Sequence, residues 1–236
     1  MSTFRFLYLV SGQGRLMRAM IRATALGVTD FEVTKVVADR SCPALDMADA
    51  LGVPIENVDY DSFLERSDYD DRLFDTIELC KPDAIVSNYN RLLRGPVLEH
   101  YKDRIINLHY SLLPAFPGMR AVEKALAYGV RCTGMTTHFI NDGVDTGPII
   151  AQAAVPLSPD FGVDDVVMAQ LKRAVPLLLN TLILVAQGRV HVHGERRVVI
   201  DGADYSSAEF SPALCPAATE MSTRLLAELG FDGPRE

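Results

Sequence analysis

The stretch FRFLYLVSGQG at positions 4–14 carries the pattern that decides the fold. Its first seven residues, Phe4–Val10, are mostly apolar and lead into a polar turn rich in glycine, Ser11–Gly14. A helix is predicted next, because apolar residues recur at helical spacing from Leu16 to Ala25. An apolar strand that passes through a glycine turn into a helix is typical of the start of a parallel α/β sheet.

The same alternation continues towards the middle of the chain. Further strands are predicted at residues 31–38, 53–58, 84–87 and 104–109, with helices at 44–51 and 62–80. Strand alternating with helix about every 25 residues favours a mostly parallel sheet with helices on both faces. The expected fold class is therefore α/β and Rossmann-like.

The pattern changes after His109. The sequence predicts a helix at 121–128, strands at 134–140 and 149–157, and a long helix at 163–187 that Pro176 should kink or divide. A small hairpin at 190–192 and 196–200 and a last helix at 217–229 follow. Residues 1–201 are predicted to form one catalytic domain, and residues 202–236 a C-terminal extension with one helix.

Composition narrows the class of protein. The chain has 236 residues and a net charge of −8, which disfavours a general nucleic-acid binder. Its four cysteines are far apart and form no C-x-x-C pair, so neither a zinc ribbon nor a disulfide framework is expected. No basic leader precedes an apolar run at the start, and no apolar run approaches about 20 residues. A cytoplasmic protein that binds neither nucleic acid nor membrane is expected.

Asn107 and His109 are the first candidate site residues. They alternate at the end of a buried strand, so both side chains should leave one face at the carboxyl edge of the sheet, where ligands bind in α/β folds. An amide donor beside an imidazole can stabilise an oxyanion in acyl transfer, and the imidazole can move a proton. A purely structural histidine is the alternative.

Asp145 lies in the turn-rich loop Asn141–Pro148. Carboxylates in such loops are usually solvated turn formers. If the loop folds back near His109, Asp145 would favour the protonated imidazole and order a water.

The loop Ser11–Arg15 is the third candidate. A glycine turn between a strand and a helix can offer backbone N–H groups to an anion, with Arg15 as the cation. The dinucleotide fingerprint needs a third glycine where this chain has Met17, and only Asp39 could take the acidic ribose role. A plain tight turn is the alternative.

These residues also carry a family resemblance. The run Asn107–His109, the following Ser111–Pro114, and Asp145–Pro148 with His138 before it resemble the folate-dependent formyltransferase family. The likeness extends from about Leu7 to Ile200. Members that act on phosphoribosylglycinamide (GAR) and the catalytic domain of the deformylases are the most similar.

The resemblance implies a Rossmann-like fold that uses 10-formyltetrahydrofolate, without a metal. Its catalytic residues would be Asn107, His109 and Asp145. Asn107 and protonated His109 would hold the oxyanion intermediate while Asp145 sustains the imidazolium charge and relays a proton through a water. The pterin would be bound, largely through backbone groups, by Arg91, Leu92, Leu93, Asn141, Asp142 and Val144. Ordinary core packing is the alternative for the two leucines.

The acceptor side departs from the family pattern. GAR-type members have serine and asparagine where this chain has Arg15 and Leu16, and proline where it has Tyr110. The expected acceptor is therefore a small primary amine, GAR-like or a specialised metabolite, in purine biosynthesis or elsewhere in one-carbon metabolism. It would be bound by Gly12, Gln13, Gly14, Arg15 and Tyr110.

Three other hypotheses remain open from the residues. One is a formyltetrahydrofolate deformylase, which releases formate; another is a non-catalytic folate-binding protein; the most distant is a dinucleotide oxidoreductase. His191 and His193 could share a strand face, but no third metal ligand is apparent. The apolar positions of the last helix, from Ala217 to Leu226, could cover the sheet or contact a second subunit in a homodimer.

Overall fold

The computed structural model describes residues 3–27 and 29–230. Two compact units make up the chain, and each is described by itself. The first runs to Asn107 and also includes Ile140–Asp142; the second consists of Leu108–Phe139 and the residues from Gly143 onwards.

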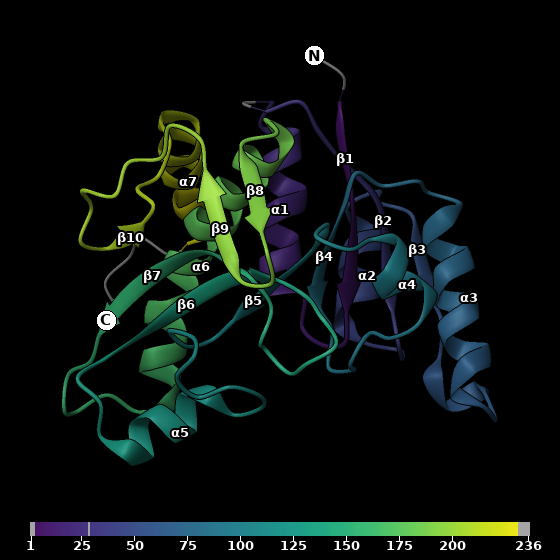
Figure 1. Cartoon of the computed structure of the whole chain (residues 1–236), viewed down its shortest axis with the longest axis horizontal. Helices are drawn as coiled ribbons and strands as arrows, with labels where there is room; N and C mark the ends of the chain where they lie inside the picture. Colours follow the sequence, from purple (N-terminus) through teal and green to yellow (C-terminus); the bar gives the residue numbers. More distant parts are fainter. Residues whose placement is uncertain (1–2, 28, 231–236) are drawn as a thin grey trace. The chain divides into compact units, whose positions relative to one another are not determined.

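A parallel sheet forms the centre of the first unit (Figure 1). Its strands follow the order β5-β4-β1-β2-β3, and every neighbouring pair is parallel. They are β1 (Phe4–Val10), β2 (Phe31–Ala38), β3 (Ile55–Asn57), β4 (Ala84–Asn88) and β5 (Ile105–His109), whose last two residues belong to the second unit. Strand β1 is thus central, as its apolar sequence requires.

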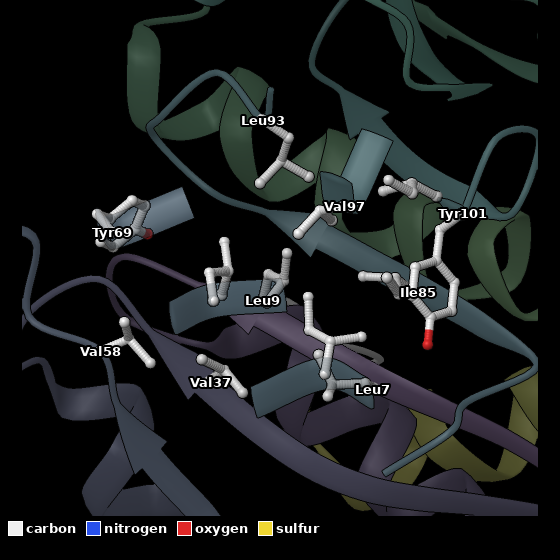
Figure 2. Packing of buried hydrophobic residues seen from close by; sticks show 12 residues of the cluster. Leu7, Leu9, Val37, Val58, Tyr69, Ile85, Leu93, Val97 and Tyr101 are labelled. Atoms are coloured by element: carbon white, nitrogen blue, oxygen red, sulfur yellow. The ribbon is translucent and has the colours of Figure 1, made fainter. Parts of the chain in front are cut away.

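Helices connect these strands: α1 (Arg15–Ala25), α2 (Pro43–Ala50), α3 (Arg66–Glu78) and α4 (Pro96–His100). Because side chains alternate along a strand, β1 buries two different sets of residues. Leu7 and Leu9 pack in a cluster with Tyr69 of α3 and Val97 of α4, as Figure 2 shows. Phe6 and Tyr8, which alternate with them, are also fully buried. Both faces of the central strand are therefore covered.

The second unit is built on antiparallel strands. Strand β6 (Cys132–Phe139) pairs with β7 (Ile149–Pro156), which pairs on its other side with β10 (Phe210–Ser211). A separate hairpin joins β8 (Val190–His193) to β9 (Arg197–Ile200). The helices are α5 (Ala121–Tyr128), α6 (Val163–Ala186) and α7 (Pro216–Glu228), and α7 packs on α6.

Helix α6 differs from the sequence prediction in two ways. Pro176 lies inside it without dividing it, so one continuous helix spans 24 residues. By length and composition this helix could cross a membrane, although no apolar run of that size was expected. Most of it is buried inside the second unit, because its apolar residues surround the helix and pack on β6, β7 and α7. It is the core helix of that unit.

The expected fold class is confirmed: the protein is α/β with a mostly parallel central sheet and helices. The helix predicted over 62–80 is shorter, because a 3₁₀ turn at Tyr60–Ser62 comes before α3. Helix α4 and strand β10 were not predicted, since five and two residues are too few for a periodic pattern. In the extension predicted at 202–236, β10 and α7 pack within the second unit; residues 231–236 lie outside the described residues.

Candidate active site

Strand β5 presents Asn107 and His109 as expected. The two residues alternate on one strand, so their side chains leave the same face. Asn107 is the last residue of the first unit, opposite Ser87 of β4, and His109 is the second residue of the second unit. His109 is 8% exposed and is thus nearly removed from water.

His109 and Asp145 lie together in the second unit. The Nδ1 atom of His109 is 3.2 Å from Oδ2 of Asp145, an ion-pair distance. The other ring nitrogen, Nε2, is 2.9 Å from the carbonyl oxygen of Phe116. The imidazole is therefore held between a carboxylate and a backbone carbonyl, which fixes the plane of the ring.

The carboxylate of Asp145 is held from several sides. Gly118 donates its backbone N–H to Oδ2 at 2.7 Å, and Nε2 of His138 lies 3.6 Å from Oδ1. Asp145 itself has a positive φ of 52°, a conformation that side chains other than glycine rarely adopt. A Cβ atom on Gly143 would lie 2.2 Å from Oγ1 of Thr146, so this tight loop requires glycine there. Backbone strain of this kind is typical of functional sites.

Burial is the strongest influence on the pKa of His109. Burial lowers the pKa of His109 below its ordinary value, and this effect exceeds the opposing influence of the Phe116 carbonyl and the Asp145 carboxylate. Asp145 raises the pKa of His109, the direction expected from the sequence, but burial lowers it by more. Loss of contact with water destabilises the charged ring, and the nearby carboxylate compensates for only part of this cost.

Asp145 stays ionised. Burial alone would raise the pKa of Asp145, but the hydrogen bond from His138, the N–H of Gly118 and the nearby His109 together lower it below its ordinary value. The site thus places an imidazole, which can accept a proton near neutral pH, beside an ionised carboxylate.

His138 is the member of this cluster that residue-level reasoning missed. It lies one residue before the end of the buried strand β6, at a register shift between Thr137 and His138 in the pairing with β7. The Nδ1 atom of His138 lies 2.9 Å from the carbonyl oxygen of Phe139. Its sequence signal was the position of a histidine just before the Asn141–Pro148 loop, which the family resemblance used without giving it a role.

The segment after His109 is fixed by buried polar side chains of the second unit. Thr136 donates its hydroxyl to the carbonyl of Ser111 at 2.7 Å and accepts the N–H of Leu113 at 3.0 Å. Gln170 donates to the carbonyls of Tyr110 and Gly134 at 3.0 and 2.9 Å. The side chain of Tyr110 is half-buried and packs against an apolar cluster, so its backbone and its ring are both restrained.

The glycine loop contains two glycines in different situations. Gly14 has a φ of 68°, and a Cβ there would lie 2.7 Å from the Cβ of Ala44, so this glycine lets α1 and α2 approach closely. Gly12 has open space around its Cβ position. Gln13 is exposed, and so is Arg15, the first residue of α1. Gly14 thus has a structural role. The side-chain positions of Gly12, Gln13 and Arg15 are open to a ligand.

Arg91 is bound inside the first unit. Its Nε atom donates to Oδ2 of Asp39 at 2.7 Å, and its guanidinium lies over the ring of Tyr60 at 3.5 Å. Burial would raise the pKa of Asp39, but its hydrogen bonds, first with Arg40 and then with Ser11 and Arg91, lower it. Asp39 is fully buried, so it cannot reach a ribose as the dinucleotide hypothesis would require.

The two leucines after Arg91 differ. Leu93 is 5% exposed and belongs to the core cluster of the first unit, so core packing explains its side chain. Leu92 is 42% exposed, and its carbonyl accepts a hydrogen bond from Arg66 at 2.5 Å. Asn141 and Asp142 belong to the first unit, next to Ile140, which donates its N–H to the carbonyl of Ile105.

Val144 belongs to the second unit, next to Asp145, and is 47% exposed. No group of three or more His, Cys, Asp or Glu side chains that could hold a metal ion is found among residues 3–27 and 29–230.

The chain belongs to the formyl transferase family, whose sequence model matches residues 4–182. This confirms the resemblance and places the protein among formyltransferase enzymes. Phosphoribosylglycinamide formyltransferase of Mycobacterium tuberculosis is 39% identical over 154 residues, which cover 65% of this chain and 71% of that protein. Formyltetrahydrofolate deformylase of Escherichia coli O6:H1 is 28% identical over 197 residues, covering 83% and 70%.

Solved structures agree with the family. The crystal structure of glycinamide ribonucleotide transformylase 1 from Symbiobacterium toebii matches with a TM-score of 0.81 and 36% identity, and the match covers 84% of this chain and 94% of that chain. The family and the fold are therefore established together.

Proposed function

We propose that this protein transfers the formyl group of 10-formyltetrahydrofolate to a primary amine of a small molecule. The observation that carries the proposal is the 3.2 Å approach of Asp145 to His109, two residues after Asn107 on β5. A solvated turn-forming carboxylate would have no reason to be held against a buried imidazole.

The exposure of two residues assigned to the folate supports this proposal. Leu92 in the first unit and Val144 in the second each expose an apolar side chain, the kind of surface on which a ring stacks. The carbonyl of Leu92 already accepts one hydrogen bond and can accept another. Arg91, Leu93, Asn141 and Asp142 would contribute through their backbones, since Arg91 and Leu93 use their side chains inside the protein.

When bound, the folate supplies the formyl carbon that the acceptor amine attacks. The side-chain amide of Asn107 donates a hydrogen bond to the formyl oxygen as negative charge develops on it. His109 accepts or donates a proton at the ring nitrogen that it turns to the substrate, and Asp145 stabilises the imidazolium formed. No step requires a metal.

The acceptor would bind beside Gly12, Gln13, Gly14, Arg15 and Tyr110. Arg15 is exposed at the start of α1, where its guanidinium and the helix N-terminus both favour an anion. This supports an acceptor amine that carries phosphate or carboxylate, and GAR is one candidate because the relatives named above include GAR formyltransferases. Purine biosynthesis, a cytoplasmic location and a homodimer stay predictions.

The deformylase reaction is the second candidate. The deformylase of Escherichia coli shares a longer part of this chain, 83%, than the formyltransferase of Mycobacterium tuberculosis, 65%. Both reactions need the negative charge that develops on the formyl oxygen to be stabilised in the same way. They differ in whether the acceptor pocket excludes water. A non-catalytic folate-binding protein is less consistent with Asn107, His109 and Asp145 all being present.

The deciding experiment incubates the protein with 10-formyltetrahydrofolate alone and then with candidate amines, GAR included, and measures release of tetrahydrofolate. Release that depends strictly on one amine would support the transferase and identify its acceptor. Release without any amine, together with formate, would favour the deformylase. Folate binding without release under any condition would overturn both and favour the binding protein.

A further inference from the structure

Three neighbouring strands of the first unit end at the same level of the sheet. Val10 of β1 pairs with Ala38 of β2 on one side and with Asn88 of β4 on the other. Between β1 and β4 the strand order changes direction, and ligands of open α/β sheets bind at the carboxyl ends beside such a point. The glycine loop, Ser11–Arg15, follows β1, and Tyr89–Leu93, which we call the folate segment, follows β4. The loops assigned to the acceptor and to the folate therefore begin side by side.

Asp39 follows β2, and its fully buried carboxylate joins these two loops. Nε of Arg91 donates to Oδ2 of Asp39 at 2.7 Å, and the hydroxyl of Ser11 donates to the same carboxylate. Oγ of Ser11 also accepts the backbone N–H of Asn90 at 2.9 Å. One carboxylate thus connects the first residue of the glycine loop with two consecutive residues of the folate segment.

The side chain of Arg91 extends across the end of β1. Because β4 and β2 lie on either side of β1, its ion pair with Asp39 spans two strand spacings, about 10 Å. The guanidinium lies over the ring of Tyr60 at 3.5 Å, and Tyr60 donates its backbone N–H to the carbonyl of Asp39 at 3.0 Å. Asp39 therefore holds Arg91 directly and also holds the ring beneath it.

The charges around Arg91 leave this role to Asp39. Asp61 lies 3.7 Å from Arg91, but its side chain is 87% exposed and such a pair contributes little. Asp39 is 0% exposed, and a carboxylate removed from water needs its cations, Arg91 and Arg40, as much as they need it. Loss of the Asp39 charge would therefore release Arg91 from its place across β1.

We propose that Asp39 is a positioning residue of this enzyme: its carboxylate holds the glycine loop and the folate segment together, so that folate bound to one also orders the other. The proposal rests on the proposed function, since that function gives each loop its substrate. Asp39 is buried and acts through Ser11 and Arg91.

Glu56 provides a matched control in the same unit. Like Asp39 it is a carboxylate bound by two cations and a hydroxyl: Lys35 lies at 2.7 Å, Arg72 at 2.6 Å and the hydroxyl of Thr76 at 3.0 Å. None of these residues belongs to either loop. Asp39→Asn and Glu56→Gln each remove one charge and keep the size of the side chain. Both should lower the Tm, so a difference between them in binding does not come from stability alone.

Hydrogen exchange without any ligand is the first measurement. Exchange in residues 11–15 and 89–93 should be faster in Asp39→Asn than in the wild type, because both loops lose a partner. Glu56→Gln should leave both loops unchanged. Ser11→Ala, which keeps the ion pair and breaks the link between the loops, takes the place of Asp39→Asn if that variant does not fold. Unchanged exchange in the two loops, or the same change in Glu56→Gln, would overturn the proposal.

Binding of tetrahydrofolate, followed by calorimetry, is the second measurement. Its Kd should rise by about tenfold in Asp39→Asn, the scale of one lost hydrogen bond, and stay at the wild-type value in Glu56→Gln. In the wild type, tetrahydrofolate should slow exchange in the glycine loop as well as in the folate segment. In Ser11→Ala it should slow exchange in the folate segment alone.

The outcomes separate this proposal from the proposed function. A wild type that binds no tetrahydrofolate would refute the proposed function, and the exchange without ligand would still decide whether Asp39 joins the loops. Normal turnover and an unchanged tetrahydrofolate Kd in Asp39→Asn would refute this proposal alone, as would a glycine loop that does not respond to tetrahydrofolate in the wild type.

Discussion

The Nε2 atom of His109 lies 2.9 Å from the carbonyl oxygen of Phe116, whose own backbone has a φ of 52°. A left-handed phenylalanine is costly, so the hydrogen bond to His109 is made by a strained segment. The imidazole and this segment are therefore coupled: whatever displaces the carbonyl of Phe116 frees a ring nitrogen for the substrate.

The first prediction concerns stability and pH. The pKa of His109 lies below its ordinary value of 6.5 and that of Asp145 below 3.8, so for both groups the unfolded chain binds protons at a higher pH. The free energy of unfolding should therefore fall as pH decreases below 6.5 through the folded pKa of His109, and again below 3.8 through that of Asp145. Urea unfolding at a series of pH values measures both steps.

A variant isolates the first of these steps. His109→Asn should lose less stability than the wild type between pH 7.5 and 5, because the group that resists protonation is gone. His191→Asn, which changes an exposed histidine, should behave like the wild type over this range. If the stability of all three proteins depended on pH in the same way, the first step could not be assigned to His109.

The second prediction concerns the catalytic pair on β5. Asn107→Ala or His109→Ala should lower kcat by roughly 10²-fold or more, the usual scale for a lost oxyanion donor, while folate binding measured by calorimetry stays nearly intact. His100→Ala, at an exposed position of α4, serves as the control. Normal turnover in both variants would refute the catalytic role.

The third prediction concerns the acceptor. Arg15→Ala should raise the acceptor KM and leave the folate Kd unchanged, because Arg15 is exposed at the start of α1. Arg18→Ala removes the same charge one turn later on the same helix, also from an exposed position, and should have a clearly smaller effect. Equal effects would mean that general charge, and no specific contact, attracts the acceptor.

The fourth prediction separates structure from binding in the glycine loop. Gly14→Ala should destabilise the protein by about 1–3 kcal/mol, because φ is positive and Ala44 blocks the new Cβ. Gly12→Ala should leave the Tm unchanged and raise the acceptor KM, since only a ligand would meet its new methyl group. A Gly12→Ala variant with unaltered kinetics would remove this residue from the acceptor site.

Much of the fold could be predicted because its signals are local. The apolar run Phe4–Val10 is mostly buried, as its sequence predicts, and the glycine turn after it leads into α1 as expected. The alternative in which Pro176 divides the helix was wrong, because the packing of α6 outweighs the hydrogen bond that a proline removes.

The site could be predicted in part for the same reason. The alternation of Asn107 and His109 is a local signal. The proximity of Asp145 to His109 could be predicted only through the family resemblance. His138 was missed because it lies in a buried strand, and its contact with Asp145 depends on how the following loop folds back. The lowering of the pKa of His109 by burial was missed because the sequence shows which charged residues are present and gives no measure of burial.

Gln170 has a consequence for how this enzyme can diversify. Its amide binds the backbone carbonyls of Tyr110 and Gly134 and touches neither residue through its side chain. Position 110 can therefore accept different side chains over evolutionary time without a change in this anchor. Descendants of one ancestor could in this way adopt new amines while the histidine next to that position keeps its place.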